Sequence, residues 1–278
     1  MATIAAALRD AVEQLHFSDT PRLDAQILLA YVLQTGRAYL VAFDEQELTD
    51  KQLRVFNELV ARRKLGEPVA YITGIRAFYD VELRVTPDVL IPRPETEHLI
   101  EAAIEYAKDK TRLVAADIGT GSGAIAVTIA KHCPQAMMFA TDISEAALAV
   151  AKDNAETIGV SVRFAQGYLA QPLLDEKLKV DLLMANLPYI ETDEVRTLEV
   201  AKHEPHLALD GGDDGLDLVR ELLHQTVDLC EKGACILLEI GTTQGEATLK
   251  LADDILQPQA ADIIKDYAGH ERIVKIIM

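Results

Sequence analysis

The chain has 278 residues, 49% of them hydrophobic, which is enough for one large domain or two with a sizeable buried core. Acidic residues outnumber basic ones 45 to 27, and the formal net charge of −18 repels phosphate backbones, so a broad nucleic-acid surface is not expected. No apolar run approaches the roughly 18 residues of a membrane span. The chain has three cysteines, and their spacings fit neither a metal knuckle nor a disulfide framework, which indicates a reducing cytoplasm.

The first part of the chain, residues 1–75, is predicted to form a small helical domain. Apolar residues recur there at helical spacing in three stretches. These stretches are residues 5–15, 23–32 and 53–60. Pro21 is expected to open the second helix and Gly36 to close it. No motif in this domain carries chemistry of its own.

The hydrophobic period changes after this domain. Short apolar groups at residues 70–72 and 78–79 flank Gly74, and the apolar residues of Val81–Val85 alternate with polar ones. This pattern predicts strands, with a hairpin over residues 76–92 that links two domains.

The next segment, Ile91–Glu97, contains two prolines and two acids. Pro94 suits the first turn of a helix, where Glu95 and Glu97 would lie beside the positive helix end. Arg93 has no such local explanation.

From Thr111 onward the pattern alternates between strand-like and helical stretches. The predicted strands are residues 113–118, 137–141, 162–165, 180–185, 234–240, 261–264 and 272–278, and the predicted helices among them include 124–131 and 145–156. This alternation predicts a doubly wound α/β domain over residues 93–278, with right-handed crossovers between parallel strands.

A glycine-rich loop, Asp-Ile-Gly-Thr-Gly-Ser-Gly, follows the first strand of this domain. Its alternate glycines, Gly119, Gly121 and Gly123, let a ligand approach the backbone and leave helix N–H groups pointing at it. A NAD-binding fingerprint has the spacing G-x-G-x-x-G, whereas G-x-G-x-G after an acid favours S-adenosylmethionine, whose ammonium Asp117 can pair. Asp142 closes the second strand 23 residues after Gly119, where an acid can bond ribose hydroxyls.

The stretch Val180–Ile190 is an apolar run that stops at an amide, a proline and an aromatic ring. It is typical of a strand buried on both faces, and Pro188 must end it. Asn186, Leu187 and Tyr189 would then project into the crevice beyond the carboxyl ends of the strands. An amide oxygen and a neighbouring carbonyl can accept both hydrogens of an NH₂ group while a ring packs on its flat face. The stretch therefore suits methyl transfer to a planar nitrogen.

Four segments together make the chain resemble the HemK/PrmC family. They are residues 91–97, 117–123, 186–189 and 204–217. Members of that family are glutamine methyltransferases that modify the Gly-Gly-Gln motif of peptide-chain release factors. The resemblance implies a Rossmann-like class I S-adenosylmethionine-dependent methyltransferase domain that methylates the glutamine N5 atom. It also makes release factors the expected partners and residues 1–75 a substrate-recognition domain.

The resemblance and the loop chemistry define the expected site. The cofactor-binding residues are Asp117, Gly119, Thr120, Gly121, Ser122, Gly123, Asp142, Tyr168 and Asn186. The catalytic residues, which hold the substrate glutamine, are Asn186, Leu187, Pro188 and Tyr189. Two positions depart from the family pattern: Leu187 stands where a proline is usual, and Gly167 where an acid is usual, so Tyr168 is expected to stack on adenine without an acidic neighbour.

Two alternatives remain open. The Asn-Leu-Pro-Tyr motif also resembles that of rRNA adenine dimethylases, and an adenine-N6 methyltransferase on rRNA or DNA would use nearly the same site chemistry. The other alternative is a non-catalytic module that only binds the cofactor.

The acidic run at residues 210–217 matches no calcium loop and is predicted to be a turn entering a helix, so no metal site is expected.

Overall fold

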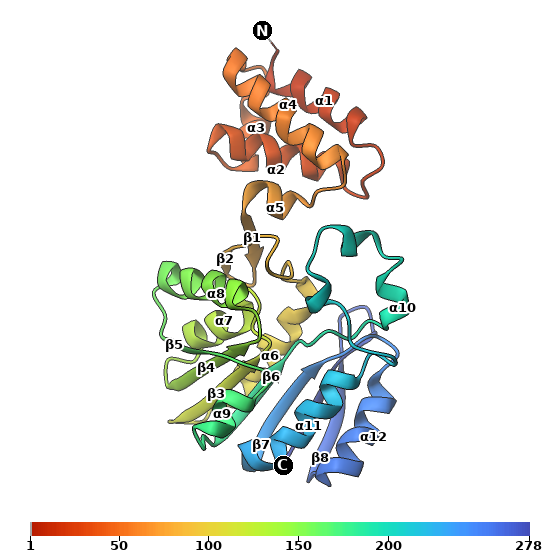
Figure 1. The fold of residues 1–278 in the computed structure, drawn as a ribbon. Helices are drawn as coiled ribbons and strands as arrows, with labels where there is room; N and C mark the ends of the chain where they lie inside the picture. Colours follow the sequence, from red (N-terminus) through yellow and green to blue (C-terminus); the bar gives the residue numbers. More distant parts are fainter. Residues whose placement is uncertain (1) are drawn as a thin grey trace. The chain divides into compact units, whose positions relative to one another are not determined.

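The computed structural model describes residues 2–278, which form two compact units that divide between Ile75 and Arg76 (Figure 1). Each unit has its own hydrophobic core. No helix within residues 2–278 is long and apolar enough to cross a membrane.

The first unit is helical, as predicted. Its helices are α1 (Ile4–Gln14), α2 (Pro21–Leu33), α3 (Arg37–Ala42), α4 (Asp50–Lys64) and α5 (Val69–Thr73). Pro21 is the first residue of α2, which confirms that prediction. Gly36 does not close α2: Gln34 ends it with a left-handed φ of 52°, and Gly36 is the N-cap of α3.

The prediction of a strand at residues 70–72 is wrong, because these residues lie in α5. Gly74 ends that helix with a φ of 73°, a conformation that favours glycine. A two-stranded sheet follows, formed by β1 (Ile75–Phe78) and β2 (Val81–Arg84). The hairpin is therefore shorter than the predicted 76–92, and residues beyond Arg84 run without regular structure to the 3₁₀ turn η1 (Pro94–Thr96).

The second unit is a doubly wound α/β domain, as predicted. Its strands are β3 (Leu113–Ile118), β4 (Ala136–Asp142), β5 (Val162–Gln166), β6 (Val180–Ala185), β7 (Cys230–Glu239), β8 (Ala260–Lys265) and β9 (Glu271–Ile277). Its helices are α6 (Glu97–Ala107), α7 (Ala124–His132), α8 (Glu145–Ile158), α9 (Gln171–Asp175), α10 (Thr192–Val195), α11 (Asp217–Leu229) and α12 (Gly245–Leu256), with short 3₁₀ turns η2 (Glu199–Lys202) and η3 (His206–Ala208).

The seven strands form one sheet in the order β5-β4-β3-β6-β7-β9-β8. The first five of these are parallel, whereas β9 runs antiparallel to both β7 and β8. Strand order reverses between β3 and β6, so the crevice at a switch point of this kind lies beyond their carboxyl ends.

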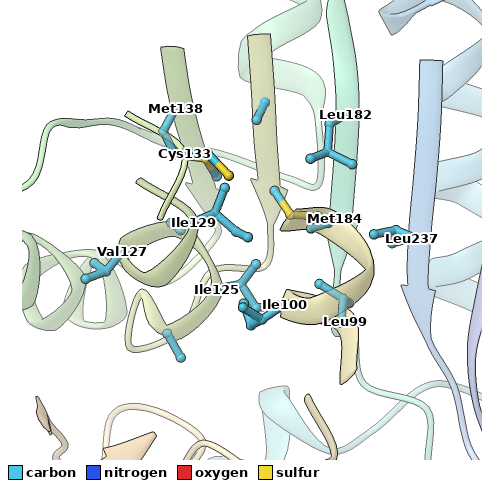
Figure 2. Packing of buried hydrophobic residues seen from close by; sticks show 14 of the residues in the cluster. Leu99, Ile100, Ile125, Val127, Ile129, Cys133, Met138, Leu182, Met184 and Leu237 are labelled. Atoms are coloured by element: carbon cyan, nitrogen blue, oxygen red, sulfur yellow. The ribbon is translucent and has the colours of Figure 1, made fainter. Parts of the chain in front are cut away.

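Alternate strand residues form two cores, one on each face of the sheet. One core joins α6 and α7 to side chains such as Leu182 and Met184 (Figure 2). The other joins α9, α11 and α12 to Leu183 and Ala185 on the opposite face of β6. Burial on both faces explains why these strands are continuous apolar runs, and why the first polar residues after each run mark the strand end.

Candidate active site

A cavity lies beyond the carboxyl ends of β3, β4 and β6. Its wall includes four of the predicted cofactor residues in the glycine loop, together with Asp142, Tyr168, Asn186, Leu187 and Pro188. Asp117, Gly123 and Tyr189, which were also predicted for the site, are not among the described residues that form this wall.

The glycine loop is held by backbone hydrogen bonds. The amides of Gly119 and Thr120 both donate to the Thr141 carbonyl at 2.9 Å. Gly119, with a φ of 73°, lies so close to Leu187 that an added Cβ would meet Leu187 Cδ2 at 2.9 Å. Gly123, with a φ of 81°, is the N-cap of α7. The loop thus presents its backbone to the cavity, and Leu187 closes the space beneath it.

Asp117 is buried near the end of β3 and holds this loop through hydrogen bonds. Its Oδ2 accepts from the Thr120 hydroxyl at 2.6 Å and from the Ala126 amide at 3.1 Å. Its Oδ1 is buried and has no hydrogen-bond partner within residues 2–278. Burial raises the pKa of Asp117 to about 7, opposed by these two hydrogen bonds.

Asp142 ends β4 and lies in the cavity wall. Its two oxygens accept from the amides of Ser144 and Gly121, each at 2.8 Å. Burial raises the pKa of Asp142, and these amide hydrogen bonds oppose the rise. Its carboxyl is therefore fixed in direction, and each oxygen keeps a lone pair for a further donor.

The Asn-Leu-Pro-Tyr turn follows β6. Asn186 Nδ2 donates to the Thr96 hydroxyl at 3.1 Å. Leu187 is buried, whereas Tyr189 is half-buried and its carbonyl accepts from Gln244 Nε2 at 2.9 Å. Burial, together with the charge of Glu239, raises the pKa of the Tyr189 hydroxyl to about 12, so this group stays protonated.

Tyr168 follows β5 and lies in the cavity wall. Its hydroxyl donates to Glu221 Oε2 at 2.7 Å, which raises the pKa of Tyr168 to about 12. An added Cβ at Gly167 would come 2.4 Å from Pro172 Cγ. Pro172 therefore leaves no room here for the acid that is usual in the family.

Several wall residues were not among those predicted for the site. Arg93 and Thr96 belong to the Pro-rich segment, and Pro205 and Leu207 follow Glu204 in the motif at residues 204–217. Arg93 pairs with Glu204. Glu204 Oε1 accepts a hydrogen bond from the Arg93 guanidinium at 2.7 Å, and its Oε2 accepts one from the Ile91 amide at 3.2 Å. The motifs at residues 91–97 and 204–217 were the only sequence signal for these residues. The contact between the two motifs depends on the tertiary structure, so the sequence alone did not predict it.

Glu239 is a further buried acid next to the site. It is the last residue of β7 and only 2% exposed. Burial raises the pKa of Glu239 to about 7, while the neighbouring polar side chains of Thr96 and Asn186 oppose the rise. Nothing in the sequence pattern distinguished it from the strand that it ends.

The acidic run at residues 210–217 is a turn that leads into α11. Asp210 accepts from the Thr192 hydroxyl at 2.7 Å, and Asp214 and Asp217 both pair with Arg220. Within residues 2–278 no group of three histidine, cysteine or acidic side chains is arranged to hold a metal ion.

The mostly parallel seven-stranded sheet, the glycine loop after β3 and the acid that ends β4 define a class I methyltransferase domain. Residues 115–203 match the family model described as methyltransferase domain, and residues 6–74 match the PrmC N-terminal domain. A ribosomal protein L11 methylase from Lactobacillus delbrueckii subsp. bulgaricus is similar in fold, with a TM-score of 0.50 and 23% identity over 70% of this chain and 83% of that one.

Two curated relatives match almost the whole chain. The release factor glutamine methyltransferase of Moorella thermoacetica is 41% identical over 97% of this chain and 96% of its own length. That of Coxiella burnetii is 40% identical over 99% of this chain and 98% of its own length. The chain belongs to the release factor glutamine methyltransferase family, which confirms the resemblance to HemK/PrmC.

Proposed function

We propose that this chain binds S-adenosylmethionine in the cavity and methylates the N5 atom of the glutamine in the Gly-Gly-Gln motif of release factors. Family membership supports the activity, and the Asn186 amide carries the chemical argument. Its nitrogen donates to Thr96, so its oxygen is free to accept from a substrate NH₂ group.

The residues around the cavity fit the proposed cofactor. The glycine loop leaves open backbone in the wall, and Asp142 is fixed in direction by two amides, as a ribose ligand should be. The Tyr168 ring, 41% exposed, offers a face for adenine. The unpartnered Oδ1 of Asp117, buried behind this wall, suits an ammonium that is reached through water. When bound, the cofactor supplies an electrophilic methyl group.

The substrate amide is the weak partner in this reaction, because its nitrogen lone pair is delocalised into its carbonyl. Asn186 Oδ1 and the Leu187 carbonyl accept its two hydrogens and aim the nitrogen along the line of transfer. Both oxygens also stabilise the positive charge that grows on the nitrogen. No strong base is required, since the methylated nitrogen readily loses its proton to water.

Residues 1–75 hold the protein substrate in this proposal, so that the glutamine loop is positioned by contacts outside the cavity. The unit contains the match to the PrmC N-terminal domain and none of the residues in the cavity wall. Translation termination places such a partner, and with it this enzyme, in the cytoplasm.

The test compares acceptors under one set of conditions. Purified enzyme is incubated with methyl-labelled S-adenosylmethionine and either a Gly-Gly-Gln peptide, the same peptide with asparagine in place of glutamine, or an adenine-containing RNA oligonucleotide. We expect label in the first peptide alone. Label in the oligonucleotide would support the adenine methyltransferase instead, and cofactor binding without any transfer would support the non-catalytic module.

A further inference from the structure

A buried carboxyl lies next to the catalytic amide, on the neighbouring strand. Ala185 of β6 pairs with Leu238 of β7, so Asn186 and Glu239 are the next residues along two adjacent parallel strands. Adjacent strands are separated by about 4.8 Å, and paired positions place their side chains on the same face. Glu239 is therefore side by side with Asn186, on the face that α6 covers.

The Thr96 hydroxyl connects these two side chains. Thr96 is 4% exposed at the start of α6, and its side chain makes no capping hydrogen bond to that helix. Its Oγ1 accepts from Asn186 Nδ2 at 3.1 Å. The Glu239 carboxyl lies close enough to the side chains of Thr96 and Asn186 for both to lower its pKa.

The direction of these bonds follows from the donor inventory. A hydroxyl has one hydrogen, and the ionised carboxylate that Glu239 carries above its pKa of about 7 can only accept. The hydrogen of Thr96 is therefore directed to Glu239, which leaves an Oγ1 lone pair for the NH₂ group of Asn186. If the Asn186 amide were reversed, its oxygen would face two other acceptors, Thr96 Oγ1 and the Glu239 carboxylate. Its NH₂ group would then face the substrate NH₂ group, so neither side would form a hydrogen bond.

We propose that Glu239 and Thr96 form a relay that fixes the Asn186 amide with its nitrogen toward Thr96 and its oxygen toward the substrate. Both are positioning residues for the methyl transfer, and neither touches the reacting atoms. The effect on turnover rests on the proposed function, whereas the orientation of the amide does not.

Stability alone does not favour a carboxyl at this position. Glu239 Oε2 is buried without a hydrogen-bond partner within residues 2–278. An unsatisfied buried polar atom is destabilising, and an apolar side chain of similar volume is often tolerated in its place. A relay role therefore predicts that removing the carboxyl lowers turnover without lowering the melting temperature.

The orientation can be tested without substrate or cofactor. The chain has three asparagines, Asn57, Asn154 and Asn186, so asparagine-selective ¹⁵N labelling gives three side-chain amide pairs. The Asn186 pair is assigned by its loss in Asn186→Ala. We expect Thr96→Val, which keeps the shape and removes the acceptor, to shift this pair and to speed its hydrogen exchange by about tenfold or more.

The matched control is Thr248→Val, at a buried threonine in α12 whose hydroxyl has no partner within residues 2–278. It should leave the Asn186 pair unchanged. Unchanged shifts and exchange of that pair in Thr96→Val would overturn the relay, whatever the enzyme methylates.

The kinetic test uses the Gly-Gly-Gln peptide. We expect Thr96→Val and Glu239→Met to lower kcat by about 10- to 100-fold, while KM for the peptide and Kd for S-adenosylmethionine change by less than about threefold. Thr96→Ser and Glu239→Gln keep an acceptor and should restore most of the rate. Wild-type kcat in both disruptive variants, or losses that simply follow the melting temperature, would overturn the positioning role. A wild-type enzyme that methylates no glutamine would contradict the proposed function, and the labelling experiment would still decide the relay.

Discussion

The proposed chemistry depends most on one side chain, that of Asn186. Its amide stands at the carboxyl end of β6, in the cavity wall, with its nitrogen bonded to Thr96. The sequence pointed to Asn186 because an apolar strand stops there, at a polar residue with a proline two positions later. The residues that orient it, Thr96 and Glu239, could not be found in that way, since they are 90 and 53 positions away in the chain.

Replacing Asn186 with alanine should lower kcat on a Gly-Gly-Gln peptide by about 10²-fold or more, because a preorganised acceptor is lost where charge develops. Affinity for S-adenosylmethionine, measured by calorimetry, should stay near that of the wild type. Asn57→Ala, at an exposed asparagine of α4, is the control for asparagine removal. Near-normal turnover of Asn186→Ala would contradict its catalytic role.

Asp142→Ala should weaken binding of S-adenosylmethionine by about 1 to 3 kcal/mol, the range for hydrogen bonds to a charged group. Part of this loss would come from the glycine loop, because Asp142 also accepts from the Gly121 amide. Titration calorimetry measures the difference directly. An unchanged affinity would mean that Asp142 does not bind the ribose.

Glu239 should make the folded protein less stable as pH rises. Its pKa is raised from 4.5 to about 7 by burial, so the unfolded chain releases the proton first. Stability is therefore lost between about pH 4.5 and pH 7 and is constant above that window with respect to this group. Glu239→Gln should remove this loss, and its advantage in melting temperature over the wild type should grow from pH 5 to pH 8.

The exchange Glu176→Gln, at an exposed position, controls for the removal of one acid. A difference between Glu239→Gln and wild type that stays constant over this pH range would show that burial does not raise the pKa of Glu239.

At the scale of elements, the cavity depends on segments that end strands and on the contacts that hold them. The Arg93–Glu204 ion pair joins the segment before α6 to the loop before η3, and Glu204 has a side chain only 1% exposed. Gln244, at the start of α12, ties the carbonyl of Tyr189 to the amide of Gly241. The second contact fixes the backbone at the end of the Asn-Leu-Pro-Tyr turn.

Glu204→Ala should reduce the free energy of unfolding by about 3 kcal/mol, because it leaves Arg93 and the Ile91 amide without their acceptor. Urea unfolding measures the change. Asp153→Ala breaks an exposed ion pair with Arg84 of the same length, 2.7 Å, and should cost less than about 1 kcal/mol. Equal effects of the two substitutions would contradict the structural role of Glu204.

The parallel strands were predictable from sequence because burial on both faces makes them apolar runs. β3 and β6 have the predicted bounds. Residues 70–72 were misread, because Tyr71 and Ile72 favour strands locally while the surrounding core selects a helix. Pairing was not predictable either: neither the antiparallel direction of β9 nor the Arg93–Glu204 contact leaves a periodic signal, since each depends on partners distant in the chain.

At the scale of the whole molecule, the proposed function assigns chemistry and partner recognition to different units. The unit that begins at Arg76 contains the sheet, both of its cores and the whole cavity wall. The unit that ends at Ile75 has a separate core. The acidic balance of 45 to 27 is a property of the whole chain and argues against a nucleic-acid substrate.

Removal of residues 1–75 should leave a folded domain that binds S-adenosylmethionine, because the α/β core is complete without them. Activity on an intact release factor should fall far more than activity on a short Gly-Gly-Gln peptide, which has no contacts to lose. Steady-state rates on the two substrates give the comparison. Equal losses would mean that the helical unit shapes the active site rather than recognising the partner.

The identity of the methylated atom can be measured directly. Intact release factor is incubated with the enzyme and a deuterated-methyl donor, digested, and analysed by tandem mass spectrometry. We expect one added methyl group, located on the side-chain nitrogen of the glutamine in the Gly-Gly-Gln motif and absent with Asn186→Ala. A methyl group on any other residue, or one that Asn186→Ala transfers equally well, would contradict it.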